Sequence, residues 1–134
     1  MSVFFERKLD TTLIENFIHE VFNIKKSEIK VFEQDDFFNG EYLNVDEKIK
    51  CLCTYRYLNG DAKTIVDLYR IEDQSPKTMV ERLKKLFGEN KWDGGVYIEN
   101  IDGDYLFFNN SFAIPVLIDD DNLEDNEVFF TKKY

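Results

Sequence analysis

The alternation of side chains in residues 48–57 is the feature that most constrains how this chain can fold. Apolar or aromatic side chains occupy every second position, which is the period of a β-strand with one buried face. The turn sequence Asn59-Gly60-Asp61 follows, and residues 62–71 (AKTIVDLYRI) return with a β-forming composition. Because Asn-Gly accepts positive φ angles, the pattern predicts an antiparallel hairpin. The residues expected on one face of its first strand are Ile49, Cys51, Cys53, Tyr55 and Tyr57.

Further strand-like segments, separated by turn residues, follow the same logic. A second hairpin is predicted around Asp102-Gly103, where it would join residues 96–100 to residues 105–108. Asn39-Gly40 predicts another short hairpin turn. The remaining predicted strands are residues 3–7, 28–33, 112–118 and 128–131.

Two segments have the period of an amphipathic helix instead. In the first, Thr12 and Glu15 have the spacing of a capping box at a helix N-terminus. Its apolar stripe is predicted to contain Leu13, Ile14, Phe17, Ile18, Val21 and Phe22.

The second helix is predicted to begin with Ser75 as the N-cap and Pro76 at the first helical position. Lys84 and Lys85 suit the negative end of the helix dipole, and Gly88 is the expected left-handed stop. Its buried stripe is predicted to be Met79, Val80, Leu83, Leu86 and Phe87.

These elements together predict an α+β fold. We expect a largely antiparallel sheet of five to seven strands, with two helices packed on one face. The 134 residues contain no repeat and no linker-like segment, so residues 1–134 are predicted to form a single globular domain.

The cysteine spacing, the charged N-terminal sequence and the shortness of the apolar runs together predict a cytoplasmic protein. Cys51 and Cys53 do not form a C-x-x-C motif, and on a strand they share one face, so we expect two reduced thiols in the core. The N-terminal sequence MSVFFERKLD has charges where an export signal would be apolar. The longest apolar run, residues 112–118, is too short to cross a bilayer.

The formal net charge of −10 is concentrated in the last third of the chain. Residues 92–131 contain ten Asp or Glu and no Lys or Arg, and six of those acids lie within residues 119–127. Nucleic acids and anionic membranes attract proteins of the opposite charge, so direct binding to either is not expected.

No motif for catalysis, metal binding or cofactor binding is found in the sequence. A calcium loop beginning at Asp119 would have Leu123 and Glu124 at its fifth and sixth positions, which breaks the EF-hand pattern. His19, the only histidine, has no Ser or Cys at a known catalytic spacing and is expected at the surface of the first helix. Asp93-Gly94-Gly95 lacks the context of a phosphate-binding loop. The chain is therefore predicted to be neither an enzyme nor a metal-binding protein.

Two acid-rich segments are candidate interfaces for a basic partner: the first places aromatic rings among carboxylates, and the second is a cluster of carboxylates with no cation among them. The alternatives are that the rings of the first point into the core and that the second is a solvated loop. The candidate partner-binding residues are Asp35, Asp36, Phe37, Phe38, Glu41 and Tyr42 in the first segment, and Asp119, Asp120, Asp121, Glu124, Asp125 and Glu127 in the second.

In size, acidity and lack of a catalytic motif, the chain resembles the small acidic immunity proteins of bacterial toxin–immunity systems, including contact-dependent inhibition. The features that carry this resemblance are the sequences DDDNLEDNE and EQDDFF. The resemblance implies a protein that binds a cognate basic toxin, of the nuclease type, and blocks it. The alternatives are an enzyme with an unrecognised carboxylate site and a non-catalytic adaptor domain.

Overall fold

The computed structural model describes residues 1–40, 45–71, 75–100, 103–110, 112–119 and 125–132, and within them the fold is α+β, as predicted. The helices are α1 (Thr11–Phe22), the 3-10 helix η1 (Lys26–Glu28), α2 (Gln34–Phe38) and α3 (Pro76–Gly88). The strands are β1 (Ser2–Phe5), β2 (Ile29–Glu33), β3 (Cys51–Tyr57), β4 (Asn59–Gly60), β5 (Thr64–Arg70), β6 (Val96–Glu99), β7 (Tyr105–Asn109), β8 (Phe112–Asp119) and β9 (Glu127–Lys132).

The strands form one sheet with the order β2-β3-β5-β1-β6-β7-β8-β9-β4. Neighbours run antiparallel except for the β2–β3 and β4–β9 pairs, so the prediction of a largely antiparallel sheet is confirmed. The predicted hairpins β3–β5 and β6–β7 are both present. The predicted number of five to seven strands was too low. All eight predicted ranges join the sheet, and the turn residues Asn59–Gly60 add a ninth strand.

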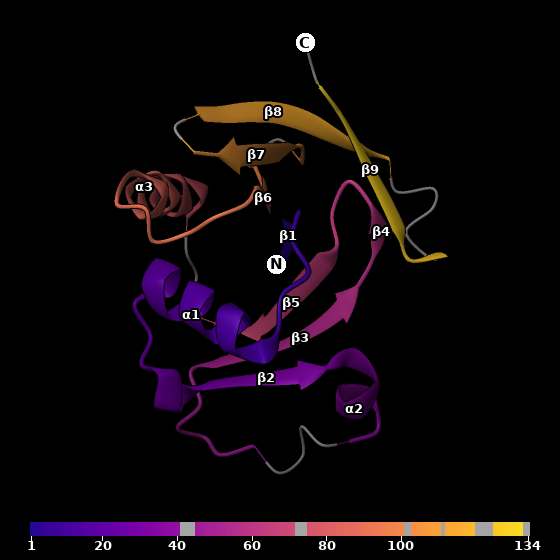
Figure 1. Cartoon of the computed structure of the whole chain (residues 1–134). Helices are drawn as coiled ribbons and strands as arrows, with labels where there is room; N and C mark the ends of the chain where they lie inside the picture. Colours follow the sequence, from indigo (N-terminus) through magenta and orange to yellow (C-terminus); the bar gives the residue numbers. More distant parts are fainter. Residues whose placement is uncertain (41–44, 72–74, 101–102, 111, 120–124, 133–134) are drawn as a thin grey trace.

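The alternation along β1 divides the core in two. Val3 and Phe5 belong to a cluster that includes the buried faces of α1 and α3, whereas Phe4 belongs to a second cluster on the opposite face of the sheet. Both α1 and α3 therefore lie on one face of the sheet, as predicted (Figure 1). The apolar stripe of α1 is buried from Ile14 to Phe22, which confirms the helical period read from the sequence.

The second face of the sheet is closed by β9, which reaches the loop of the β3–β5 hairpin. The Asn59 and Asp61 amides donate hydrogen bonds to the carbonyl oxygens of Asn126 and Val128, each with an N···O distance of 2.8 Å. The Phe130 amide in turn donates to Oδ2 of Asp61 at 2.7 Å. A Cβ atom on Gly60, where φ is +101°, would lie 2.2 Å from the Val128 carbonyl oxygen, so the close approach requires glycine.

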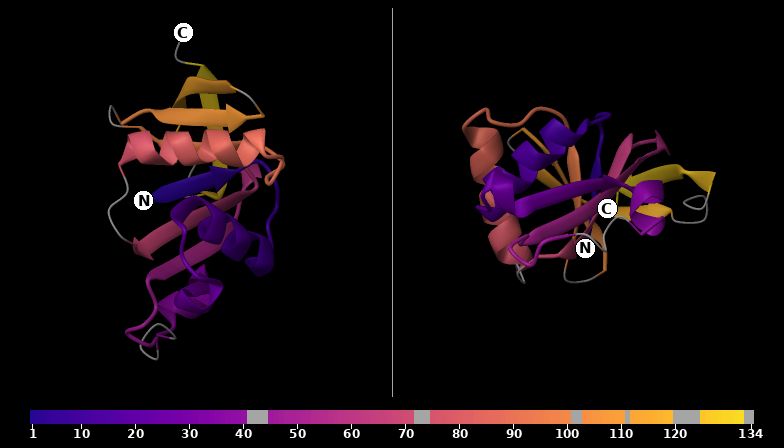
Figure 2. Two further views of the ribbon diagram at one scale, coloured as in Figure 1. Left: turned by 90° about the vertical axis from the view of Figure 1, so that its left-hand side faces the viewer. Right: turned by 90° about the horizontal axis from the view of Figure 1, so that it is seen from below.

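The closure encloses a second, aromatic core. Phe4, Tyr97 and Val128 are buried inside it, and the Phe130 ring stacks on Tyr97 with a centroid distance of 3.9 Å. Burial raises the pKa of Tyr97 well above its usual value. The right-hand view of Figure 2 shows the result, with α1 and α3 on one side of the molecule and β9 and α2 on the other.

The helix ends differ in part from the prediction. Ser75 caps α3 through the Thr78 amide as expected, but α1 is capped by Asp10, whose side chain accepts from the Leu13 amide, and not by Thr12. Asp10 is the N-cap because its carboxylate lies one residue before the first helical turn, within reach of the free backbone amides of that turn. The left-handed residue after α3 is Asn90 with φ 56°, and Gly88 remains inside the helix.

The segment before Asn39-Gly40 is a helix, and the prediction of a hairpin turn there is wrong. α2 carries Asp35 and Asp36 in its first turn, where carboxylates interact favourably with the helix dipole. Asn39 ends the helix, with its amide donating back to the carbonyls of Asp35 and Phe37, and Gly40 follows with φ 95°.

The two thiols generate the first testable prediction. Cys51 and Cys53 are free and have 0% exposure, which confirms the predicted burial. A hydrogen bond with the Cys51 thiol and burial raise the pKa of the Cys53 thiol. Because alkylation needs an accessible thiolate, iodoacetamide should label the native protein slowly even near about pH 9 and rapidly in denaturant. Rapid labelling of both residues in native buffer would contradict the buried arrangement.

The raised pKa also fixes the direction of a pH effect. Over the range in which the unfolded chain has lost the Cys53 proton and the folded protein still holds it, the folded state binds more protons. The free energy of unfolding should therefore fall as the pH rises above the pKa of the unfolded thiol.

The second prediction concerns the contact that holds β9. Asp61→Ala removes the acceptor of the Phe130 amide, and because this hydrogen bond is exposed we expect a loss of about 1 kcal/mol in the free energy of unfolding. Asp61→Asn is the matched control, since it keeps a side-chain oxygen and should lose less. Urea unfolding of the three proteins measures the effect, and equal stability of Asp61→Ala and wild type would show that this bond does not secure β9.

Candidate functional site

The first predicted partner-binding segment lies on α2 and presents one ring to solvent. Asp35 and Asp36 are exposed, Phe37 is half-buried, and the Phe38 side chain is 64% exposed. Glu41 and Tyr42 lie outside the described residues, as do Asp120, Asp121 and Glu124 of the second segment. The binding surface and the buried position expected for these rings each apply to one phenylalanine. Phe37 packs inward, and Phe38 points outward.

Phe37 fastens α2 to the sheet through aromatic contacts. Its ring stacks on Tyr69 of β5 with a centroid distance of 5.1 Å and an interplanar angle of 11°, and it lies 6.2 Å from the Phe32 ring of β2. Tyr69 is the extra residue at a register shift, because Leu52 pairs with Arg70 while Cys53 pairs with Leu68. We call Asp35, Asp36, Phe38 and Tyr69 the α2 surface.

The sequence that surrounds α2 is acidic. Residues 31–47 contain six Asp or Glu and no Lys or Arg. Arg70, at the end of β5, donates to the backbone carbonyls of Asp46 and Ile49 at 3.2 and 3.1 Å, so its side chain is held by the backbone. Burial, with smaller contributions from Tyr57, Glu33 and Asp36, raises the pKa of Tyr55 on the adjacent β3.

The second predicted segment connects β8 to β9, and its described acids lie beside exposed apolar side chains. Asp119 pairs across the two strands with Phe129, and Leu117 pairs with Thr131. Leu117 and Phe129 are 42% and 39% exposed, while the alternating residues Val116 and Ile118 face the second core. We call Leu117, Asp119 and Phe129 the β8–β9 surface. Asp125 is exposed and Glu127, which begins β9, is half-buried.

The two surfaces are separate but lie on the same side of the molecule. Figure 1 and the right-hand view of Figure 2 both place α2 and the start of β9 on the side opposite α1 and α3. The end of β3 and the strand β4 lie between them (Figure 1). Arg56 of β3 donates to the side chain of Asn126, so a cation that is distant in the sequence reaches the acidic segment in space. The sequence showed no such cation within residues 92–131.

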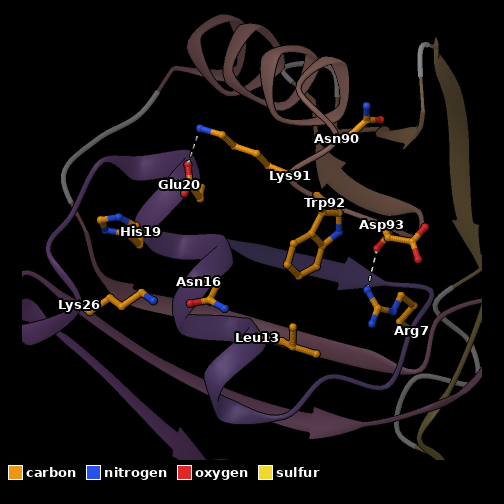
Figure 3. Close-up of a pocket in the computed structure, with 10 residues that line it drawn as sticks. All are labelled: Arg7, Leu13, Asn16, His19, Glu20, Lys26, Asn90, Lys91, Trp92 and Asp93. Carbon is orange, nitrogen blue, oxygen red and sulfur yellow. Dashed lines mark hydrogen bonds and ion pairs between the residues drawn. The ribbon is translucent and has the colours of Figure 1, made fainter.

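A hollow in the described part of the chain lies elsewhere, between α1 and residues 90–93 (Figure 3). This trough has a volume of about 520 Å³ and includes Arg7, Asn16, His19 and Lys91 in its lining. Trp92 forms one wall and is fixed by ring contacts with Phe5 and Phe17 at 5.8 and 5.1 Å. No Ser or Cys is among the residues that line it, so the trough offers no hydroxyl or thiol nucleophile.

His19 has a structural role at the end of α1. It is half-buried, and its Nδ1 lies 2.8 Å from the carbonyl oxygen of Ile24, to which it donates when protonated at that nitrogen. The prediction of a simple surface histidine is therefore only partly right. Through this contact His19 tethers the turn that follows α1 to the helix.

The glycine pair in Asp93-Gly94-Gly95 serves the packing of β1 against β6. Arg7 donates to the Asp93 carbonyl at 3.1 Å, and a Cβ on Gly94 would lie 2.5 Å from Arg7 Cδ. The Gly95 amide donates to Oε1 of Glu6 at 2.8 Å. The two glycines therefore make room for the side chains of Glu6 and Arg7.

The described residues also bear on metal binding and on membrane insertion. No group of three or more His, Cys, Asp or Glu side chains that could hold a metal ion is found there. None of the described helices is long and apolar enough to cross a membrane. That the protein acts without a metal or a cofactor stays a prediction.

Sequence reasoning missed three residues of the candidate surfaces. Tyr69 reaches the α2 surface only through the bulge in β5, which no residue pattern announces. Leu117 and Phe129 could have been found from the sequence. Strands β8 and β9 have apolar residues at consecutive positions, so both faces of each strand are apolar and one of them must be exposed or covered by another element.

Comparison of the chain with models of protein families, with curated protein sequences and with solved structures gives no match. Its function therefore has to be inferred from the charge, exposure and packing of its own residues.

Proposed function

We propose that this protein is an inhibitor that binds a basic protein partner and blocks it, as an immunity protein neutralises a nuclease-type toxin. It would act in the cytoplasm of the cell that makes it. The observation that carries the proposal is the β8–β9 surface, where the exposed apolar side chains of Leu117 and Phe129 flank Asp119 at the start of a segment with six acids in nine residues.

The charge of such a surface suits the chemistry of a nuclease. An enzyme that gathers phosphate groups needs Lys and Arg in its cleft, and clustered carboxylates complement that field. Complementary charge raises the rate of association, while desolvated apolar contacts slow dissociation. The β8–β9 surface combines both kinds of residue on two paired strands, which hold their backbone in place.

An adaptor role would use the same surfaces and differs only in the partner. An enzymatic role has less support. The carboxylate of Glu20 in the trough lies 3.7 Å from the ammonium group of Lys91 and is thus paired, and the described lining has no hydroxyl or thiol nucleophile. The inhibitor is therefore the function that the exposed residues favour.

The proposal predicts that a gene next to the one for this chain encodes a basic protein domain, and it is tested with that domain; a neighbourhood that encodes no such domain would count against it. That domain should arrest growth when it is produced alone, and co-production of this chain should restore growth. The two purified proteins should form a complex in isothermal titration calorimetry, and the complex should lack the nuclease activity of the free domain. A toxic neighbouring domain that this chain neither binds nor inhibits would overturn the proposal.

The third prediction concerns the acids. Changing Asp119, Asp120, Asp121, Glu124 and Asp125 to their amides should slow association roughly tenfold at low salt and flatten its dependence on salt, because fewer charges steer the encounter. Stopped-flow measurements at several salt concentrations test this. Thermal unfolding of the variant should match or exceed that of wild type, since like-charge repulsion is relieved.

A matched pair of double variants separates location from net charge. Asp119→Asn/Asp125→Asn and Glu81→Gln/Asp93→Asn both remove two negative charges, but Glu81 and Asp93 are exposed on α3 and beside the trough. The first should slow association more than the second. Equal rates for both would mean that only overall charge matters and that the β8–β9 surface is no binding site.

A further inference from the structure

We infer that the α2 surface is the anchor of the complex, where the rings of Phe38 and Tyr69 seat an arginine or lysine side chain of the basic partner between the carboxylates of Asp35 and Asp36. This inference rests on the proposed inhibitory function. It assigns different tasks to the two surfaces: the β8–β9 surface steers the partner, and the α2 surface holds it.

Exposure is the first reason. Phe38 has the largest exposed fraction among the large apolar side chains of the described residues, at 64%, and Tyr69 follows at 52%. Apart from its contact with the Phe37 ring, the Phe38 side chain gains little folding free energy from its position, whereas burial of its exposed surface in an interface would be favourable. One face of the Tyr69 ring is covered by Phe37, so the exposed area lies on its other face and edge.

Rigidity is the second reason. Phe37 is stacked on Tyr69 and also contacts Phe38, with a centroid distance of 5.7 Å between the two phenylalanine rings. The three rings are thus linked, and Phe37 connects the exposed Phe38 to Tyr69, which is part of β5 in the sheet. Interface hot spots are typically large aromatic side chains that lose little conformational entropy on binding.

Charge selects the occupant. Asp35 and Asp36 are exposed on the same short helix, and residues 31–47 contribute no cation that would neutralise them. A guanidinium or ammonium group is attracted both to carboxylates and to the faces of aromatic rings. The protein already contains one such contact elsewhere, with the ammonium group of Lys8 4.5 Å from the centroid of the Tyr57 ring.

The fourth prediction contrasts the adjacent phenylalanines. Phe38→Ala should weaken binding of the neighbouring-gene toxin domain at least about thirtyfold, the size of an interface hot spot, and leave the thermal unfolding midpoint unchanged. Phe37→Ala should lower the unfolding midpoint, because that ring joins α2 to the sheet. Phe38→Tyr, which keeps the ring, should retain most of the affinity, and Phe38→Leu should fall between the alanine and tyrosine variants.

The charges are tested in the same titrations. Asp35→Asn/Asp36→Asn should raise the dissociation rate, while the control Glu81→Gln/Asp93→Asn, which removes equal charge on the other side of the molecule, should leave it unchanged. Phe38→Ala with wild-type affinity would overturn the anchor while the inhibitory function stands. Absence of any complex with wild type would overturn the inhibitory function and the anchor together.

A second copy of this chain is the competing occupant of the exposed rings. Sedimentation equilibrium of the isolated protein should show a monomer. A wild-type dimer that Phe38→Ala converts to monomers would mean that the α2 surface joins two copies, and the proposed anchor would then be wrong.

Discussion

The short parallel pairing of β4 with β9 is the constraint on which the rest of the architecture depends. A nine-stranded sheet with helices on one face leaves an apolar opposite face that water would contact. The turn after β3 closes this face by pairing with the backbone of β9, and Gly60 allows the close approach. The Asp61 amide donates to the Val128 carbonyl oxygen, and the Asp61 carboxylate accepts from the Phe130 amide. This contact helps to bury the aromatic core around Phe4 and Tyr97, to which Val128 of β9 belongs.

Closure also decides where the charge goes. Once Val116, Ile118 and Phe130 face the second core, the alternating residues of β8 and β9 must face outward, and these include Asp119 and Phe129. Asn126, just before β9, is held by two partners: the Asn59 amide donates to its carbonyl oxygen, and Arg56 donates to its side chain. The described acids Asp119, Asp125 and Glu127 thus lie on or next to strands whose backbone is paired.

The sequence predicts what depends on local period and turn chemistry, and little else. The strands, the two long helices, the buried thiols and the Ser75 cap follow from residues close to one another in the chain. Two features that escaped depend on distant contacts: β4 exists because β9 pairs with it, and α2 because Phe37 packs on Tyr69. The end of α3 was misplaced for a local reason, because the helix continues through Gly88 and the left-handed residue is Asn90. The acidic part of the candidate site could be predicted from the sequence, because acids can be counted. That Phe38 and not Phe37 is exposed could be learned only from the folded structure.

The contrast between Phe37 and Phe38 bears on why an acidic protein would keep exposed rings. A five-residue helix has little stability of its own, and α2 persists because one of its two rings packs on β2 and β5. Fold stability accounts for Phe37, whereas Phe38 contacts only the edge of this cluster and leaves most of its own side chain exposed. In a surface whose charge already ensures solubility, an apolar side chain can be exposed with little risk of self-association, because like-charged copies repel one another. The carboxylates that repel a second copy attract a cationic protein. The exposed Phe38 ring and these carboxylates together therefore favour a basic partner over a second copy.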